Sequence, residues 1–576
     1  MKKTGAWLAR YALEQLGIKH TFGIPGVHNT ELYDELNNSE MITPHLVTHE
    51  VSAAFMADAV TRTTSSLGTL VIVPAAGLTH AMSGIGEAYL DGIGMLVITG
   101  GINRSTGKQY QLHQIDQLEL TKGITKAGFR IENHNEIVAT LFRAHRIATS
   151  GKPGPVLVEL PVDIQLFKGE VKHLPEFQPL STSQAVSESL LNQAADLLKT
   201  AKKPAMFVGW GAKNARSEVL ALAERFNMPI ATTLQGLSVV PSDHPLHVGM
   251  SFGRHAVPAA EQAFADCDCL VAIGTCFSEI PTGSYGITVP EQLIHIDIDE
   301  AVFDQNYPAK VAICADAKQA VSQLNQLAEK LSIGAQHNQQ IQNNIEQAKQ
   351  AYQQEWRELA TDRVNPAALF SQLDSALSQD CLFVVDDGNH TFLTAELMPF
   401  SQQRSFISPT DFNCMGYAVP AAIGAKIANP DRQVVSVVGD GAFMMTCMEL
   451  VTANQHELGL VYFVFNDGEL SQISQGQEIP YNRKTCTQLG KVDFSGIAQA
   501  TGSHYLRINN NDEINDVVEQ ALSLMKTHKT VIVDVAIEYS KRTRFTQGVV
   551  KTNVERFPLQ DKLRIVSRAL TRKITG

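Results

Sequence analysis

The 576-residue chain has few cysteines, no excess of basic residues and no long hydrophobic run. Its eight cysteines are scattered, and Cys267 and Cys269 are separated by one residue. A zinc site prefers a spacing of about two to four residues. The cysteine usage therefore argues against a metal finger, and we interpret the cysteines as reduced residues in a reducing compartment.

The charge balance and the absence of long apolar runs exclude further classes of protein. Lys and Arg total 47 against 59 Asp and Glu, a formal net charge of −12. Nucleic acid is not an expected partner, because neutralising phosphates requires clustered cations. No window approaches the roughly 18 apolar residues of a membrane span. Arg10 and Glu14 interrupt the first apolar stretch too early for a signal peptide, so we expect a cytoplasmic protein.

What the chain does have is an ordinary globular composition, with 44% hydrophobic and 18% charged residues. Its length suits about three or four domains. In three stretches, apolar strand-like runs alternate with helix-like periodic segments, which is typical of parallel α/β domains. We predict a first domain over 1–168, a central domain over 186–330, a connecting helix over 331–360, a last domain over 361–540 and a basic amphipathic tail over 541–576.

One strand-helix-strand unit carries the strongest functional signal. The β-branched run 434–438 predicts a buried parallel strand that stops at Gly439-Asp440-Gly441. Helical periodicity follows over 445–458, and a second apolar strand, 460–465, stops at Asn466-Asp467-Gly468. The two aspartates are therefore expected at the carboxyl ends of two strands of one sheet. Open α/β sheets bind their ligands at that edge.

Two carboxylates at one sheet edge suit a magnesium ion that holds a diphosphate. Mg²⁺ prefers oxygen ligands and usually combines one or two carboxylates with phosphate oxygens. The alternative is a pair of aspartates that cap a helix and a turn. Gly-Asp-Gly is followed, after one helix and one strand, by a second aspartate turn, Asn-Asp-Gly. This combination favours the metal site.

This segment resembles the thiamine-diphosphate binding motif of the thiamine enzymes, and the likeness extends over nearly the whole chain to their acetolactate (acetohydroxyacid) synthase-like branch. The resemblance implies three doubly wound parallel-sheet domains, of which the outer two bind the pyrimidine and diphosphate parts of the cofactor. It also implies that Asp440, Asp467 and the backbone carbonyl of Glu469 bind Mg²⁺. The other matching pieces, in chain order, are Gly23-Ile24-Pro25-Gly26, His49-Glu50, His113-Gln114, Asp387-Gly388-Asn389-His390 and Met415-Gly416.

The resemblance implies a role for each piece. Glu50, between a predicted strand and a predicted helix, would hydrogen-bond the aminopyrimidine ring and assist loss of the cofactor's C2 proton. His113 and Gln114 would stabilise the developing alkoxide of the substrate, and Met415 would hold the bend between the two cofactor rings. The alternatives are a first-turn glutamate that complements the helix dipole, a polar loop pair and a core methionine. The remaining implied cofactor-binding residues are Pro25, Gly26, Gly388, Asn389, His390, Gly439, Gly441 and Ala442.

The implied activity is decarboxylation of a 2-oxoacid, with pyruvate as the expected substrate, and transfer of the two-carbon unit to a carbonyl acceptor. In the family the glutamate and the Gly-Asp-Gly aspartate meet across a subunit interface, so a homodimer or a dimer of dimers is implied. Two alternatives stay open: decarboxylation or carbon–carbon lysis without ligation, and a non-catalytic paralogous subunit. The joint presence of Glu50, Asp440 and Asp467 argues against the second.

Three departures from the family pattern bear on substrate and cofactor. Pro74-Ala75-Ala76-Gly77 replaces Ser-Gly-Pro-Gly, which makes the substrate lining at Ala76 more apolar. Gly476 stands where branched-chain synthases carry a tryptophan that selects the acceptor, so we expect a wider pocket. The stretch 274–279 replaces the Arg-Phe-Asp-Asp-Arg that accompanies flavin binding. FAD is therefore not expected, although Gly209-Trp210-Gly211 leaves it open.

The tail from Lys541 to Gly576 contains ten basic residues and two acidic ones. Five of its apolar residues share one face of a predicted helix: Leu559, Leu563, Val566, Leu570 and Ile574. We expect this face to dock on the body of the chain or on a neighbouring subunit. An active-site lid or a contact with a membrane surface is the alternative.

Overall fold

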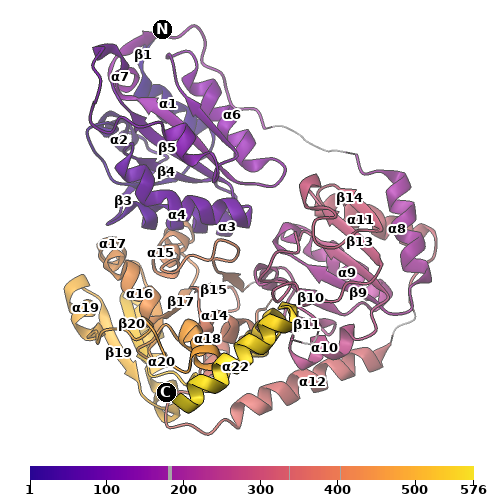
Figure 1. Cartoon of the computed structure of the whole chain (residues 1–576). Coiled ribbons are helices and arrows are strands. Elements are labelled where there is room, and N and C mark those ends of the chain that lie inside the picture. Colours follow the sequence, from indigo (N-terminus) through magenta and orange to yellow (C-terminus); the bar gives the residue numbers. More distant parts are fainter. Residues whose placement is uncertain (180–184, 254, 336–337, 402–403, 576) are drawn as a thin grey trace.

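The computed structural model of the chain describes residues 1–179, 185–253, 255–335, 338–401 and 404–575, without the side chains of 479–480, 565–566 and 573–575. It contains three six-stranded sheets in which every strand pairing is parallel (Figure 1). This confirms the predicted class of three parallel-sheet α/β domains. The polar segment predicted to link the first two sheets includes residues 180–184, which lie outside the described residues.

The first sheet has the strand order β3-β2-β4-β5-β7-β6. Its strands are β2 (His20–Gly23), β3 (Thr43–Leu46), β4 (Gly68–Ile72), β5 (Met95–Gly101), β6 (Ala127–Arg130) and β7 (Pro155–Pro161). The central strands β4, β5 and β7 are buried along their whole length, as their nearly continuous apolar sequences require. The helices are α1 (Gly5–Gln15), α2 (Thr30–Asn37), α3 (Glu50–Thr63), α4 (Ala76–Asp91), α5 (Gln117–Thr121), α6 (Ile137–Thr149) and α7 (Val162–Leu166). A short antiparallel pair, β1 (Lys2–Thr4) with β8 (Lys168–Glu170), closes this domain.

The last sheet has the order β16-β15-β17-β18-β20-β19, which repeats the topology of the first. Its strands are β15 (Leu382–Val385), β16 (Ser405–Ile407), β17 (Val434–Gly439), β18 (Leu460–Phe465), β19 (His504–Ile508) and β20 (Thr530–Val535). Its helices are α13 (Pro366–Ala376), α14 (Asn389–Leu397), α15 (Ala418–Ala428), α16 (Asp440–Thr446), α17 (Leu450–Gln455), α18 (Ser471–Tyr481), α19 (Phe494–Thr501) and α20 (Ile514–Lys526).

The predicted helix over 445–458 was wrong at its start. Helix α16 begins at Asp440, and a short 3-10 turn at Cys447–Glu449 separates it from α17. The physical reason is that Gly439 both ends β17 and precedes the first helical residue in extended conformation, so the chain passes from strand to helix without a loop. Asp440 therefore belongs to the first turn of a helix.

The middle sheet has a different order, β11-β10-β9-β12-β13-β14. Its strands are β9 (Pro204–Val208), β10 (Ile230–Thr232), β11 (His247–Met250), β12 (Cys269–Ile273), β13 (Gln292–Asp297) and β14 (Val311–Cys314), and its helices are α8 (Glu188–Thr200), α9 (Arg216–Phe226), α10 (Pro258–Phe264) and α11 (Ala317–Lys330). The long helix α12 (Gln339–Arg357) leads to the last domain. It buries one stripe, Ile345, Ala348, Tyr352 and Trp356, at helical spacing.

The first and last domains pack directly on one another through α3 and α15 (Figure 1). Small residues allow the two helices to approach closely, since a Cβ added to Gly424 would lie 2.5 Å from the Cα of Met56. Buried alanines on both helices belong to one continuous hydrophobic core. This contact fixes where the two outer sheets lie relative to each other within one chain.

The tail forms two helices, α21 (Arg544–Arg556) and α22 (Leu559–Thr575). Helix α21 is anchored at its start, because Phe545 stacks on Phe392 with ring centroids 4.3 Å apart. The backbone N–H groups of Arg544 and Phe545 both donate to Glu396. Farther along, the buried Thr552 lies against Gly286 of the middle domain. Helix α21 therefore ties the middle and last domains together.

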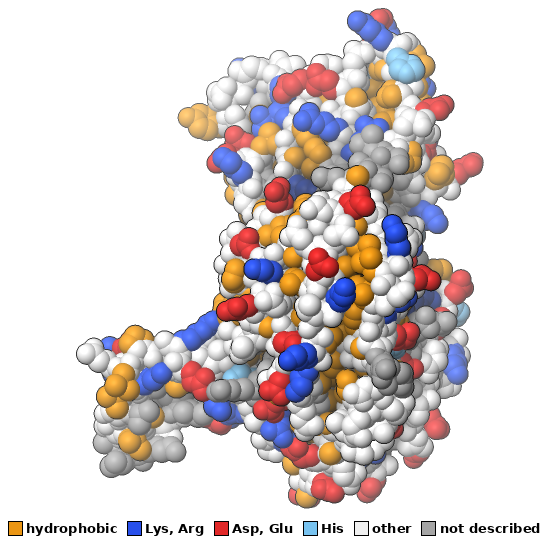
Figure 2. Space-filling view, turned by 90° about the vertical axis from the view of Figure 1, so that its right-hand side faces the viewer, with side chains coloured by type: hydrophobic (Ala, Val, Ile, Leu, Met, Phe, Trp, Pro, Cys, Tyr) orange, Lys and Arg blue, Asp and Glu red, His pale blue; other side chains and the backbone are white. Residues whose placement is uncertain are grey.

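Helix α22 does not dock its apolar face on the body of this chain, contrary to that part of the sequence prediction. Leu559, Leu563 and Leu570 are 72%, 62% and 56% exposed. The contact with α18 is made instead by Arg568 and Arg572, whose guanidinium groups lie 5.7 and 5.3 Å from the ring centroid of Tyr481. The side chains of Val566 and Ile574, assigned to the same face, lie outside the described part. Figure 2 shows the helix projecting from the body.

The surface carries charges of both signs. On the face shown in Figure 2, basic and acidic side chains are interspersed, so no basic stripe stands out there. Among the described residues, no helix is both long enough and apolar enough to span a membrane.

Candidate functional site

The carboxyl ends of β17 and β18 bring the two predicted metal-binding aspartates together. Asp440 accepts hydrogen bonds from the backbone N–H groups of Gly441 (2.8 Å) and Gly468 (2.7 Å), so it touches both strand-end turns. Burial raises the pKa of Asp440 to about 6, and the neighbouring Asp467 carboxylate adds to the rise. Burial also raises the pKa of Asp467. A buried carboxylate at Asp440 and a half-buried one at Asp467 that repel each other favour a bound cation, because a cation offsets their repulsion.

The turn after β18 is held by a neighbouring loop. Leu470 and Leu489 donate backbone hydrogen bonds to Thr487 (2.7 Å) and Gly468 (2.9 Å). The side chain of Glu469 is directed to Lys484, 2.7 Å away. Its carboxylate is thereby engaged outside the aspartate pair, which agrees with the expectation that Glu469 contributes its backbone carbonyl.

His390 lies at the centre of the predicted diphosphate cradle. It is fully buried, and burial lowers its pKa to about 3, so its ring is neutral. A Cβ on Gly388 would lie 2.7 Å from this ring and one on Gly439 would lie 3.1 Å from it, which explains why both turns carry glycine. The His390 Nε2 atom has no hydrogen-bond partner among the described residues. A buried unpartnered nitrogen at a glycine-lined sheet edge fits a phosphate oxygen.

Met415 reaches the same place from the end of β16. Its ε-methyl group lies 3.8 Å from the position that a Cβ on Gly441 would occupy. The buried Asp386 holds the turn that follows, because it accepts from the N–H groups of Gly416 (2.9 Å) and Ala418 (2.7 Å). The cradle residues Asn389 and Ala442 lie in the first turns of α14 and α16. The residues that follow four neighbouring strands of the last sheet thus lie at one edge of that sheet.

Glu50 occupies the matching edge of the first sheet. It is the first residue of α3, is 6% exposed, and its Oε2 lies 3.0 Å from Nδ1 of His80 in α4. The other carboxylate oxygen faces Gly77, whose added Cβ would lie 3.1 Å away. The preceding Thr48 is held by the last domain, since its N–H and hydroxyl donate to Glu449 at 3.1 and 2.6 Å. Glu50 is therefore held on a fixed helix start.

The other first-domain site residues follow the neighbouring strands. His113 lies in the loop after β5 with φ +65°, and its Nδ1 is 3.3 Å from Nδ1 of His28. Gln114 is exposed and accepts a hydrogen bond from the N–H of Gln111. The Gly26 N–H donates to Asn29 at 2.7 Å. Pro25 precedes it after β2, and Ala76 is the first residue of α4 after β4.

Within the described residues, no hydrogen bond or ion pair joins Glu50 to Asp440, Asp467 or Met415. Gly476 lies on α18, and a Cβ added there would have no described heavy atom within 4 Å. Sequence reasoning gave no role to Asp386, His80 or Glu449. Asp386 follows directly after a strand and was open to the same argument as Asp440, whereas His80 and Glu449 carried no local signal.

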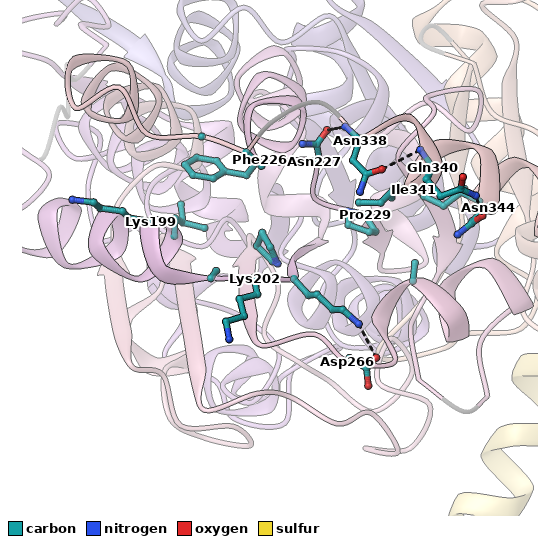
Figure 3. Close-up of a pocket in the computed structure, with 18 of the residues that line it drawn as sticks. Lys199, Lys202, Phe226, Asn227, Pro229, Asp266, Asn338, Gln340, Ile341 and Asn344 are labelled. Atoms are coloured by element: carbon teal, nitrogen blue, oxygen red, sulfur yellow. Dashed lines mark hydrogen bonds and ion pairs between the residues drawn. The ribbon is translucent and has the colours of Figure 1, made fainter.

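A cavity lies away from these residues, at the amino-terminal edge of the middle sheet (Figure 3). It encloses about 680 Å³ between the strand starts and α12. Lys203 pairs with Asp266 on one side, and the N–H of Asn338 donates to Asn227 on the other. None of the predicted site residues lines it, so cavity size does not locate the chemistry in this molecule.

Three family models match the chain in the order of its sheets. They are the thiamine pyrophosphate enzyme N-terminal TPP binding domain over residues 2–120, the central domain over 191–324 and the C-terminal TPP binding domain over 386–535. The class defined by these matches is a thiamine pyrophosphate enzyme.

Curated relatives narrow the class. The chain is 31% identical over 513 residues to acetolactate synthase isozyme 1 large subunit of Escherichia coli, covering 88% of this chain and 90% of that protein. It is 32% identical over 549 residues to the probable acetolactate synthase large subunit of Methanocaldococcus jannaschii, covering 92% and 90%. This chain belongs to the acetolactate synthase-like family of thiamine pyrophosphate enzymes, which confirms the resemblance stated from the motifs.

Proposed function

We propose that this chain is a thiamine-diphosphate- and Mg²⁺-dependent enzyme that decarboxylates pyruvate and ligates the two-carbon unit to a carbonyl acceptor. The observation that carries the proposal is the pair of carboxylates at one sheet edge, the buried Asp440 and the half-buried Asp467, with the unpartnered Nε2 of His390 at the same edge. The printed names of the relatives, acetolactate synthase large subunits, support the same activity.

The last domain would hold the cofactor through its diphosphate. Asp440, Asp467 and the Glu469 carbonyl would bind Mg²⁺, and His390, protonated beside the bound diphosphate, would donate from Nε2 to a phosphate oxygen. The glycines at 388, 439 and 441 let their turns lie close to His390 and Leu470, since any side chain there would meet one of these two residues. When bound, thiamine diphosphate supplies the nucleophilic carbon and the electron sink that decarboxylation of a 2-oxoacid needs.

The first domain would supply proton transfer and oxyanion binding. Glu50 would exchange a proton with the aminopyrimidine ring, and its low exposure strengthens that hydrogen bond by excluding water. His113 and Gln114 would donate hydrogen bonds to the substrate oxygen where negative charge develops. Met415 would pack against the cofactor rings from the last domain.

We propose further that the two clusters meet between two copies of the chain in a symmetric dimer. In the family the glutamate and the Gly-Asp-Gly aspartate meet across a subunit interface, and the lack of a hydrogen bond or ion pair between Glu50 and the aspartate pair among the described residues agrees with such a shared site. Mixing two inactive variants, Glu50→Gln and Asp440→Ala, tests this arrangement. In a two-fold dimer, each mixed dimer has one intact site and should regain about half of the wild-type activity. Absence of any regain would place each site within one chain.

The proposal does not include a flavin. The cavity at the carboxyl edge of the middle sheet encloses about 320 Å³ and is lined by Trp210, Asp297 and Asp411 among others. Burial raises the pKa of Asp297 and of Asp411 to about 6. The same cavity is also lined by Lys152 and Lys213, so its charge is mixed and does not by itself select or reject a diphosphate. Visible absorption of the purified protein tests this point, since bound flavin is yellow.

Product analysis by NMR tests the activity itself. With pyruvate and Mg²⁺ we expect acetolactate, and with added aldehydes or ketoacids we expect the corresponding ligated products. Acetaldehyde without any ligated product would replace the proposal with a non-ligating decarboxylase.

A further inference from the structure

The surroundings of Glu50 contain a second group of metal-binding side chains, with donor atoms of a different kind from those at Asp440. His49, Glu50 and His80 each offer one ligand atom, and these atoms all lie within 4.8 Å of one another. His80 Nδ1 is already 3.0 Å from Glu50 Oε2. The rings of His49 and His80 are stacked, with centroids 4.7 Å apart and planes inclined by 28°.

The three side chains are held by rigid elements. His49 and Glu50 are the N-cap and first residue of α3, and His80 lies in the second turn of α4. The two helices pack closely, since a Cβ on Gly84 of α4 would lie 2.4 Å from Cβ of Ala54 in α3. The backbone spacing of the three residues is therefore fixed, while the half-exposed His80 side chain retains freedom to rotate.

A single ion can be reached by small side-chain rotations. Ligands of one tetrahedral Zn²⁺ lie about 3.3 Å apart, as follows from bonds of about 2.0–2.1 Å. The His80–Glu50 pair already meets that distance, and the present upper separation of 4.8 Å must shorten by about 1.5 Å. His49 Nδ1 now accepts a hydrogen bond from the Val51 N–H (3.2 Å).

We propose that His49, Glu50 and His80 form a binding site for a divalent transition-metal ion of the Zn²⁺ type. Two imidazoles and one carboxylate, with a fourth position open to water, are a ligand set of protein zinc sites. Mg²⁺ prefers oxygen ligands alone. The chain thus carries two metal-binding groups of opposite preference: oxygen donors at Asp440 and Asp467, and mainly nitrogen donors at Glu50.

Occupancy of this site has a consequence for activity, which rests on the proposed function. A Glu50 carboxylate bound to Zn²⁺ cannot exchange a proton with the cofactor. Zinc at this site therefore inhibits the proton transfer assigned to Glu50, while the diphosphate remains held by the last domain.

Calorimetric titration of the full chain with ZnCl₂, in buffer containing excess Mg²⁺, tests the site without measuring activity. We expect saturable Zn²⁺ binding that His80→Asn weakens by at least about 10–100-fold, because loss of a direct ligand costs no less than loss of a residue that supports one. His504→Asn, at an exposed histidine of β19, is the matched control and should leave the affinity unchanged. Equal Zn²⁺ affinity in wild type and His80→Asn overturns the proposal.

Cobalt gives a second readout that a merely structural role of His80 would not move. Co²⁺ at the site should give visible absorption bands of a four-coordinate ion, and these bands should disappear in His80→Asn and in Glu50→Gln but persist in His504→Asn. Circular dichroism verifies that each variant folds. Zinc binding in a chain that forms no acetolactate would contradict the proposed function alone, whereas an active enzyme without zinc binding would contradict this inference alone.

Discussion

The first and last domains have the same sheet order, and each places its site residues after the same four strands, but the residues differ in kind. In the last domain the ends of β17 and β18 carry Asp440 and Asp467. At the corresponding ends of β4 and β5 the first domain carries Ala76 and His113. Topology thus makes an edge available for ligands, and the side chains at that edge decide which ligand it binds.

The two sheet edges also differ in how far their site residues are buried. In the last domain, Asp440 and His390 are buried, Asp440 accepts two backbone hydrogen bonds, and the His390 ring is neutral. In the first domain, Ala76 and His80 are exposed, whereas Glu50 is buried. The polar groups of the last-domain edge are therefore enclosed by the chain itself, while part of the first-domain edge is open to solvent.

The largest expected effect is the loss of cofactor binding at the last-domain edge. Asp440→Ala should abolish binding of thiamine diphosphate in the presence of Mg²⁺, because removal of a carboxylate ligand leaves the diphosphate charge uncompensated. Isothermal calorimetry measures this. Asp362→Ala, at an exposed aspartate of the same domain, is the control and should bind normally. Unchanged cofactor affinity in EDTA would refute metal-dependent binding.

The next largest effect is on proton transfer at the first-domain edge. Glu50→Gln should slow hydrogen–deuterium exchange at C2 of bound cofactor by about 10²–10⁴-fold, because an amide cannot transfer the proton. Cofactor affinity should change little, since the diphosphate is held by the other domain. NMR of quenched samples measures the exchange rate. A wild-type rate in this variant would remove Glu50 from the mechanism.

A smaller effect concerns the choice of acceptor. A Cβ added at Gly476 would have open space around it, so the Gly476→Trp variant should fold normally. Its indole ring should narrow the acceptor pocket. We expect wild type to show no strong preference for 2-oxobutyrate over pyruvate, and the variant to shift toward 2-oxobutyrate by about 1–3 kcal/mol at most. Competition between the two acceptors, with both products quantified, measures the shift. A wild-type preference of tens of times for 2-oxobutyrate would show that Gly476 does not line the acceptor pocket.

The smallest effect is a pH dependence of cofactor binding at the last-domain edge. Burial raises the pKa of Asp440 to about 6, and Mg²⁺ needs the carboxylate ionised. Metal-dependent cofactor binding should therefore weaken as pH falls below 6, by up to about tenfold per pH unit. The same raised pKa makes Asp440 a stabilising group for the metal-free chain below pH 4, and this stabilisation is lost as pH rises through 6. Calorimetry and thermal unfolding between pH 4 and 7 measure the two trends. Cofactor affinity that does not change across this range would contradict the assigned role of Asp440.

Much of the fold and several elements of the site were predictable because their signals are local. Continuous apolar runs such as 434–438 and 460–465 predict buried parallel strands, and β17 and β18 lie there. The residues after those strands follow from the rule that strand ends share an edge. The tail shows the limit of such patterns. Its leucine spacing predicts an amphipathic helix correctly but does not encode what the apolar face contacts.

Local sequence patterns were enough to predict the three parallel-sheet domains, the family and the strand ends at which the candidate site residues stand. The hydrogen bond between His80 and Glu50, across 30 residues, and the one that holds Thr48 at Glu449, across 401, became visible only in the folded chain. The physical reason is that strand and helix formation depend on neighbours a few residues away, whereas these contacts depend on how whole domains pack, which no local spacing of residues records.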